Sequence, residues 1–386
     1  MENTKQIYAD WAATAPLHPA AAAELRHWLE NPVPANPSSV HSYGMDAADR
    51  LAAARTLLAE AVGWDGEITF VSGGTEGLAL AVYSLVRRSL DAGRNRVILS
   101  PLEHPAVKEA VRAFALPAGM TAEECAVTSG GTVDLADLSA RLGDDVGFCA
   151  VMAVQNETGV IQPVPEAAVL AHRCGALLLT DAIQAAGHIP LRLQADVMVI
   201  SGHKFGGPPG TGAVFHRMPL LPLQKGGGQE GGYRGGTENL PGICAMAAAS
   251  SRWGEPDWMA GLRDRLERQF VRRMAASGIA VKITGESSPR IGSVSHILFP
   301  AGTLGETLVL GCDLAGLAVS AGSACHSASP EPSAALTAMG YTPAEAVRGV
   351  RLSFGFGTTE AEMEAAYRIL GDAAERLCAV GMHKHG

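Results

Sequence analysis

The chain has 386 residues, of which 47% are hydrophobic and 18% charged, and its formal net charge is −9. This length allows about two domains with separate cores. The negative charge argues against nucleic acid as a general partner, and no run of about 18 apolar residues would span a membrane.

The N-terminus, M-E-N-T-K-Q-I-Y, lacks the basic and apolar segments of a secretory signal peptide. The seven cysteines are scattered, and no two have the spacing C-x-x-C. This pattern argues against a zinc ribbon and against a disulfide framework. We therefore expect a cytoplasmic protein without a metal site.

Helical and strand patterns alternate along the first half of the chain. Residues 45–62 are rich in Ala and Leu at helical spacing and predict a helix. The runs that predict buried strands are 68–71, 96–100, 148–154, 176–181 and 197–201, and the predicted helices between them are 75–89, 105–115, 134–141 and 165–174. This alternation predicts a largely parallel sheet with helices on both faces.

The pattern changes after about residue 217. Residues 223–239 are rich in glycine, which indicates a mobile or ligand-clasping segment rather than a strand. Helices and short strands resume from about residue 250. We expect a large domain over 15–250 and a smaller α+β domain formed by 1–14 and 251–386.

In parallel sheets, ligands bind beyond the carboxyl ends of the strands, and four predicted ends carry polar groups. The stretch S-G-G-T at 72–75 opens a helix, where free N–H groups and the Thr75 hydroxyl suit a phosphate; a plain turn capped by Thr75 is the alternative. His104 follows a second strand. Asp181 ends a third, where a buried carboxylate needs a cationic partner. Lys204 follows a fourth, where a poorly hydrated amine becomes a nucleophile.

Each of these groups has a structural explanation when it is taken singly. Together they match the needs of pyridoxal phosphate: a phosphate cradle, an amine nucleophile, a carboxylate for the pyridine nitrogen and a flat ring for stacking.

A lone cysteine lies in a stretch that favours neither helix nor strand. Cys325 stands in S-A-G-S-A-C-H-S-A-S-P-E-P-S, residues 320–333. Structural cysteines usually occupy apolar faces, as we expect for Cys149 and Cys174. The composition around Cys325 instead predicts a mobile loop over about 320–333 that carries a reactive thiol.

These features resemble the cysteine desulfurases, enzymes of the class V aminotransferase family that use pyridoxal phosphate. The similar motifs run along essentially the whole chain: Y-A-D-W-A-A-T-A-P (8–16), A-N-P-S-S-V-H (35–41), S-G-G-T-E (72–76), E-H-P-A-V (103–107), V-Q-N-E-T-G (154–159), D-A-I-Q (181–184), S-G-H-K (201–204), R-G-G-T-E-N (234–239), G-S-A-C (322–325) and R-L-S-F-G (351–355). The resemblance implies an α/β architecture of the type I pyridoxal-phosphate-dependent transferase fold, with a large, mainly parallel sheet flanked by helices and a smaller α+β C-terminal domain.

The resemblance also implies a role for each residue of the site. These roles are Schiff-base formation by Lys204, ring stacking by His104, pairing with the pyridine nitrogen by Asp181, a hydrogen bond to the phenolic oxygen by Gln184, phosphate binding by Gly74, Thr75, Ser201 and His203, phosphate binding in the neighbouring subunit by Thr237, and substrate-carboxylate binding by Asn156 and Arg351, with Asn36 near the substrate. The role of Thr237 implies a homodimer with sites at its interface.

The resemblance gives Cys325 a task that suits a loop. The thiol would take sulfur from L-cysteine as a persulfide, leave L-alanine, and carry the sulfur to an acceptor protein. The 26 positions from Cys325 to Arg351 resemble the longer-looped, NifS- and IscS-like branch. Departures from the family pattern are Ala15 in place of Thr, Gly74 in place of Ala, and Phe356–Gly357 where Arg is common.

Several alternatives stay open. A selenocysteine lyase or another class V lyase or aminotransferase would share the fold, and a non-enzymatic scaffold is a remote possibility. A nicotinamide dehydrogenase is disfavoured because S-G-G-T-E-G lacks the spacing G-x-G-x-x-G. The pathway that takes the sulfur is also open, among iron–sulfur cluster assembly, nitrogenase maturation, tRNA thiolation and DNA phosphorothioation.

Overall fold

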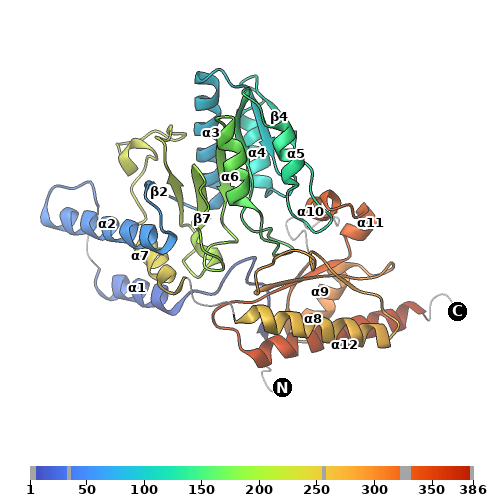
Figure 1. Ribbon diagram of the computed structural model, residues 1–386. Coiled ribbons are helices and arrows are strands. Elements are labelled where there is room, and N and C mark those ends of the chain that lie inside the picture. The colour runs from blue at the N-terminus through green and yellow to red at the C-terminus, as the bar shows by residue number, and fades with distance from the viewer. Residues whose placement is uncertain (1–5, 33–35, 254–257, 322–331, 383–386) are drawn as a thin grey trace.

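The computed structural model describes residues 6–32, 36–253, 258–321 and 332–382 (Figure 1). A seven-stranded sheet forms the centre of its larger part, in the order β2-β8-β7-β6-β5-β3-β4. The strands are β2 (Glu67–Val71), β3 (Arg96–Leu99), β4 (Thr121–Glu124), β5 (Val146–Ala150), β6 (Leu177–Asp181), β7 (Val197–Ser201) and β8 (Gly212–His216). Among them only β8 runs against the others, because residues 202–211 return the chain from β7 without an α-helical crossover. The largely parallel sheet is confirmed; β4 and β8 were not predicted.

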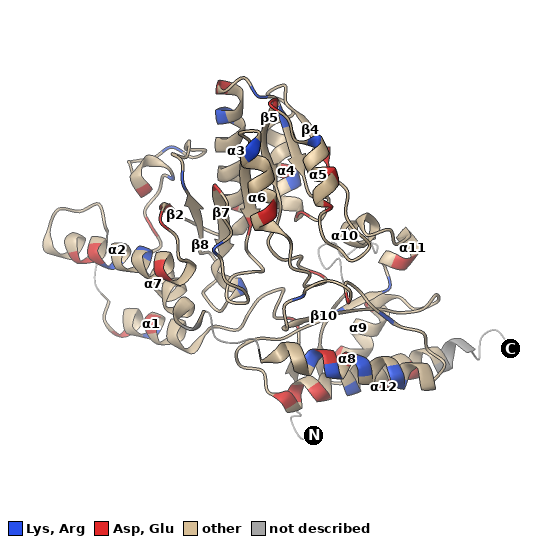
Figure 2. Cartoon of the chain, in the orientation of Figure 1, with Lys and Arg blue, Asp and Glu red and all other residues tan. Residues whose placement is uncertain are grey.

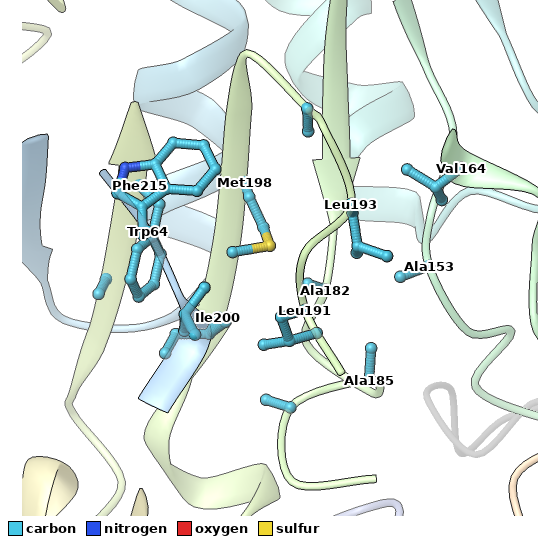
Figure 3. Packing of buried hydrophobic residues seen from close by; sticks show 14 of the residues in the cluster. Trp64, Ala153, Val164, Ala182, Ala185, Leu191, Leu193, Met198, Ile200 and Phe215 are labelled. Atoms are coloured by element: carbon cyan, nitrogen blue, oxygen red, sulfur yellow. The ribbon is translucent and has the colours of Figure 1, made fainter. Parts of the chain in front are cut away.

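Helices cover both faces of this sheet, as the alternation predicts (Figure 1). One face packs against α3 (Gly74–Asp91) and α4 (Pro105–Phe114). The other packs against α1 (Pro19–Glu30), α2 (Ser42–Val62), α5 (Leu135–Arg141), α6 (Val164–Arg173) and α7 (Leu240–Ala249). Figure 3 shows part of this second core, where Met198, Ile200 and Phe215 of neighbouring strands meet apolar side chains of the covering segments.

Two local expectations need correction. Helix α3 begins at Gly74 with Gly73 as its N-cap and no side-chain cap, so Thr75 is not the capping residue. Residues 320–333 are not irregular throughout. Ser320–Ala321 form strand β12, which pairs with β13 (Gly349–Ser353), and Ser333 caps α10 (Ala334–Ala338).

The C-terminal part has a second core around smaller sheets. Strands β12, β13, β10 (Val294–Leu298) and β9 (Lys282–Ile283) form an antiparallel sheet in that order. Strand β1 (Ile7–Tyr8) pairs in parallel with β11 (Leu317–Ala318), so the start of the described chain lies with this part. Its helices are α8 (Met259–Ala276), α9 (Gly305–Leu314), α11 (Pro343–Ala346) and α12 (Glu360–Met382).

Charged residues recur along α8 and α12 (Figure 2). Arg273 of α8 pairs with Asp372 and Glu375 of α12, the latter at 2.7 Å. The two helices bury apolar side chains in the second core and are joined by ion pairs, while Arg263 and Glu267 of α8 are themselves buried. Within the described residues, none of the helices has the length and apolar character needed to cross a membrane.

Candidate active site

Lys204 lies just beyond the carboxyl end of β7, in a single turn of 3-10 helix at Gly202–Lys204. Gly202 permits this tight turn, because a Cβ there would lie 2.3 Å from Thr211 Oγ1. The Lys204 Nζ donates hydrogen bonds to the carbonyls of Ala12 at 2.8 Å and Ala13 at 2.9 Å. Gln184 Nε2 donates to the same Ala12 carbonyl at 2.8 Å. The motif at residues 8–16, the first motif of the chain, therefore contacts both Lys204 and Gln184.

Asp181 ends strand β6 and is 3% exposed. Its Oδ1 accepts a hydrogen bond from the Ile183 N–H at 2.9 Å. Burial raises the pKa of Asp181 to about 6, against the opposing effects of the Ile183 N–H and the Lys204 charge. A buried carboxyl of this kind is stabilised in its ionised form by a cationic partner.

His104 is the N-cap of α4, and Pro105 takes the first helical position. Its Nδ1 accepts a hydrogen bond from the Ala106 N–H at 3.1 Å, which places the proton of the neutral ring on Nε2. Burial, and secondly the Lys204 charge, lower the pKa of His104. The ring is therefore uncharged at neutral pH, which suits stacking.

The N-terminus of α3 lies beside the end of β7. A Cβ on Gly73 would lie 3.9 Å from Ser201 Oγ, and one on Gly74 would lie 3.7 Å from Ser201 Cβ. Glu76 in the first turn accepts a hydrogen bond from the Ser72 N–H at 2.7 Å and pairs with Arg234 at 2.7 Å. The Arg234 guanidinium thus compensates the negative charge of Glu76 at a helix N-terminus, where an anion would bind.

His203 lies next to Lys204 and contacts the first motif. Its Nδ1 is 3.3 Å from Thr14 Oγ1. Burial, with a smaller effect of the Lys204 charge, lowers the pKa of His203 to about 4. A neutral imidazole at this position serves as a hydrogen-bond donor or acceptor rather than as a charge.

Arg351 of β13 is 5% exposed and reaches the same region from the C-terminal part. Its Nη2 donates to Asp10 Oδ1 at 2.7 Å and its Nη1 to the Asn156 carbonyl at 2.9 Å. The structure thus brings Asn156 and Arg351 together, and it adds Asp10, to which sequence reasoning gave no role.

Two predicted residues, Asn36 and Thr237, are not brought into this cluster, and a third is not described. Cys325 lies outside the described residues. Asn36 is exposed, and its Oδ1 accepts a hydrogen bond from the Ser38 N–H at 3.0 Å instead of meeting a site residue. Thr237 is exposed in the glycine-rich segment, which the Arg234–Glu76 pair attaches to α3.

Sequence reasoning also overlooked Glu103. This residue is 4% exposed, and its Oε1 accepts a hydrogen bond from the Met152 N–H at 2.5 Å. Burial and, to a smaller extent, the nearby Asp181 raise the pKa of Glu103 to about 8. Its position directly before His104, at the end of a predicted strand, could have indicated a role in the site.

The chain matches the family model of class-V aminotransferases over residues 7–366. It is 36% identical to a cysteine desulfurase of Cereibacter sphaeroides over 97% of each chain, and 36% identical to an IscS-like cysteine desulfurase of Mycobacterium tuberculosis over 96% of each. Among solved structures, a NifS-like protein aligns with a TM-score of 0.85 at 28% identity, over 96% of this chain and 99% of its own. The fold is therefore that of the type I transferases, and the chain belongs to the class-V aminotransferase family. Within that family it belongs with the cysteine desulfurases.

Proposed function

We propose that this chain is a pyridoxal-phosphate-dependent enzyme that converts L-cysteine to L-alanine and transfers the sulfur to Cys325. The observation that carries the proposal is the convergence of Lys204, Asp181 and His104 at one edge of the sheet, with Arg351 nearby. Full-length similarity to cysteine desulfurases supports the same reaction.

The donor set fits pyridoxal phosphate. The glycines at the start of α3 leave free N–H groups where a phosphate binds, beside Ser201. The buried carboxyl of Asp181 suits a protonated pyridine nitrogen. The residues that would hold the cofactor are Lys204, His104, Gly74, Thr75, Asp181, Gln184, Ser201 and His203, with Thr237 supplied by a second subunit. When bound, this cofactor supplies an electron sink for the substrate's Cα.

The chain's own groups then bind the substrate and move its protons. The Arg351 guanidinium binds the substrate carboxylate, with Asn156 beside it. The Lys204 Nζ takes the Cα proton, since its amine is the base at this strand end. His104 exchanges a proton with the substrate thiol through Nε2. Asn36 remains a weaker candidate for a substrate contact.

Cys325 completes the reaction as a nucleophile. Its thiolate attacks the substrate sulfur, so an S–S bond forms while the bond between substrate Cβ and sulfur breaks. The electron pair of that bond stays with the carbon fragment, which takes up a proton at Cβ, regains the Cα proton from Lys204 and leaves as alanine. A persulfide remains on Cys325 for delivery to an acceptor protein.

We further propose a cytoplasmic homodimer with its sites at the subunit interface. We also propose iron–sulfur cluster assembly as the pathway that uses the sulfur, which the resemblance to the NifS- and IscS-like branch implies.

The test is product analysis with purified protein, pyridoxal phosphate, L-cysteine and a reducing thiol. We expect equal amounts of alanine and sulfide from the wild type. Cys325→Ala should lose both products by about a hundredfold or more while it retains the cofactor's absorbance. The buried Cys312 provides a matched control, and Cys312→Ala should keep the product ratio.

Other products would contradict the proposal. Sulfide with pyruvate would indicate β-elimination and leave Cys325 without a role. Turnover of selenocysteine alone would identify a selenocysteine lyase. An unchanged alanine yield in Cys325→Ala would exclude the persulfide step.

A further inference from the structure

Glu103 is a buried carboxyl that none of the steps above uses. It lies between strand β3 and His104, and its backbone N–H donates to the Ser100 carbonyl at 3.1 Å in the turn after the strand. Its Oε1 accepts the Met152 N–H, and Met152 lies just beyond the end of β5. The side chain therefore joins the loop that carries His104 to the neighbouring strand.

The same backbone segment also contacts Asp181. Ala153, the residue after Met152, donates its N–H to the Asp181 carbonyl at 2.8 Å. In the sheet, β5 lies between β3 and β6, so Glu103 and Asp181 approach residues 152–153 from opposite sides. Two buried carboxyls thus lie at one edge of the sheet, and each disfavours ionisation of the other.

The surroundings of Glu103 offer little to stabilise its negative charge. Its Oε2 is buried and has no hydrogen-bond partner among the described residues. Lys108 of α4 faces the group, but its Nζ binds the Pro101 carbonyl at 2.8 Å and pairs with Glu124 at 2.9 Å. The thiols of Cys125 and Cys149 also face it, and burial raises the pKa of both. A buried carboxylate without a direct cation is costly, so the neutral acid is favoured.

We propose that Glu103 is a positioning residue of the active site, a neutral carboxylic acid that ties the loop of His104 to strand β5 and leaves the negative charge of the pair to Asp181. The inference rests on the roles proposed above for His104 and Asp181. It concerns how the chain places these two groups relative to each other.

The proton on Glu103 has a measurable consequence for stability. The pKa of Glu103 is raised from 4.5 to about 8 in the folded protein, so between these values the folded chain holds a proton that the unfolded chain has released. The folded state then binds more protons, and its stability falls as the pH rises through this window. Above it the dependence ends.

The first experiment compares the full-length wild type with Glu103→Gln, whose amide oxygen still accepts the Met152 N–H but cannot ionise. Both are unfolded with denaturant at pH 5 to 9, without cofactor. Relative to Glu103→Gln, the unfolding equilibrium constant of the wild type should rise by up to about tenfold per pH unit within the window. Glu124 is half exposed and pairs with the same lysine, so Glu124→Gln is the matched control and should parallel the wild type.

The second experiment measures the dissociation constant of pyridoxal phosphate at pH 7 and tests the tie itself. Glu103→Gln should bind within about twofold of the wild type, because the hydrogen bond persists without a change of charge. Glu103→Ala should bind about tenfold more weakly, because the loop of His104 loses its attachment. If Glu103→Ala fails to fold, the pH comparison with Glu103→Gln still decides the charge.

The outcomes separate this proposal from the site assignment. Parallel pH curves for the wild type and Glu103→Gln would show that Glu103 is ionised and overturn the proposal. Unchanged binding of pyridoxal phosphate by a folded Glu103→Ala variant would show that Glu103 does not position the loop of His104. Asp181→Asn tests the assignment on its own: undiminished cofactor binding there would remove the role of Asp181, whatever Glu103 does.

Discussion

Arg351 is held on two sides by the protein itself. Asp10 accepts from one terminal nitrogen and the Asn156 carbonyl from the other, while the Nε is buried with no hydrogen-bond partner among the described residues. These contacts fix the plane of the guanidinium. A planar donor in a fixed orientation can bind a carboxylate through two parallel hydrogen bonds, which a lysine cannot do.

Replacing Arg351 by Lys tests this role at the residue scale. The lysine ammonium keeps the charge but cannot donate two parallel hydrogen bonds. We therefore expect the KM for L-cysteine to rise about tenfold, equal to about 1.4 kcal/mol of binding free energy. The cofactor's absorbance should not change. Arg348 lies three residues away and approaches Glu345 at 3.6 Å, and Arg348→Lys should leave KM as it is. An unchanged KM in Arg351→Lys would place the substrate carboxylate elsewhere.

At the scale of elements, the start of α3 and the end of β6 fit together through two small features. The Ile183 N–H binds the Asp181 carboxyl, and the Ile183 side chain lies against the first residue of α3. A Cβ on Gly74 would lie 2.3 Å from Ile183 Cδ1. Gly74, which departs from the family pattern, therefore leaves the space that the Ile183 side chain occupies.

A double-mutant cycle checks this match. Gly74→Ala forces either Ile183 or the helix start to move, and we expect pyridoxal phosphate to bind about fivefold more weakly, a loss of about 1 kcal/mol. Adding Ile183→Val removes the contacting methyl and should restore binding. A Cβ on Gly261 in α8 would have open space around it, so Gly261→Ala controls for a glycine replacement in a helix. Equal weakening in the single and double variants would contradict the coupling.

At the scale of the whole molecule, two parts of the chain contribute residues to one candidate site. The parallel sheet supplies Lys204, Asp181 and His104 at its carboxyl edge, whereas Arg351 comes from the antiparallel sheet of the C-terminal part. The first motif crosses between them, since the Ala12 N–H donates to Ser353 Oγ at 2.9 Å and the Ala12 carbonyl accepts from Lys204. Thr237 remains exposed at the end of the glycine-rich segment.

Mixed dimers test whether Thr237 acts on the neighbouring subunit. Lys204→Ala and Thr237→Ala would each impair both sites of their own dimers. In a mixed dimer, one site combines an intact Lys204 with the partner's intact Thr237. After random exchange, about a quarter of all sites should recover wild-type cofactor binding, measured as cofactor fixed to Lys204 by borohydride. No recovery beyond the separate variants, in a sample shown by sedimentation to contain dimers, would confine Thr237 to its own chain.

The types of most elements in the large sheet could be read from the sequence, because periodicity and turn residues act over short distances. The apolar runs that end at Asp181 and before Lys204 predicted strands β6 and β7, and Pro105 marked the start of α4. The order of motifs then identified the family, and the same strand ends supplied the candidate cofactor residues. Strand β8 was missed because G-A-V-F-H is short and follows β7 without an α-helix between them.

What the sequence determined by itself is therefore the local structure, the family and the residue types at the strand ends. The tertiary structure alone decided which of those residues meet. Asp10 and Arg351 are 341 positions apart, and Asn156 and Arg351 are 195 apart. The pKa of Glu103 is raised because folding buries the carboxyl and, to a smaller extent, because Asp181 lies nearby. Long-range contacts of this kind depend on how sheets and helices pack, and they cannot be predicted from the local spacing of residues.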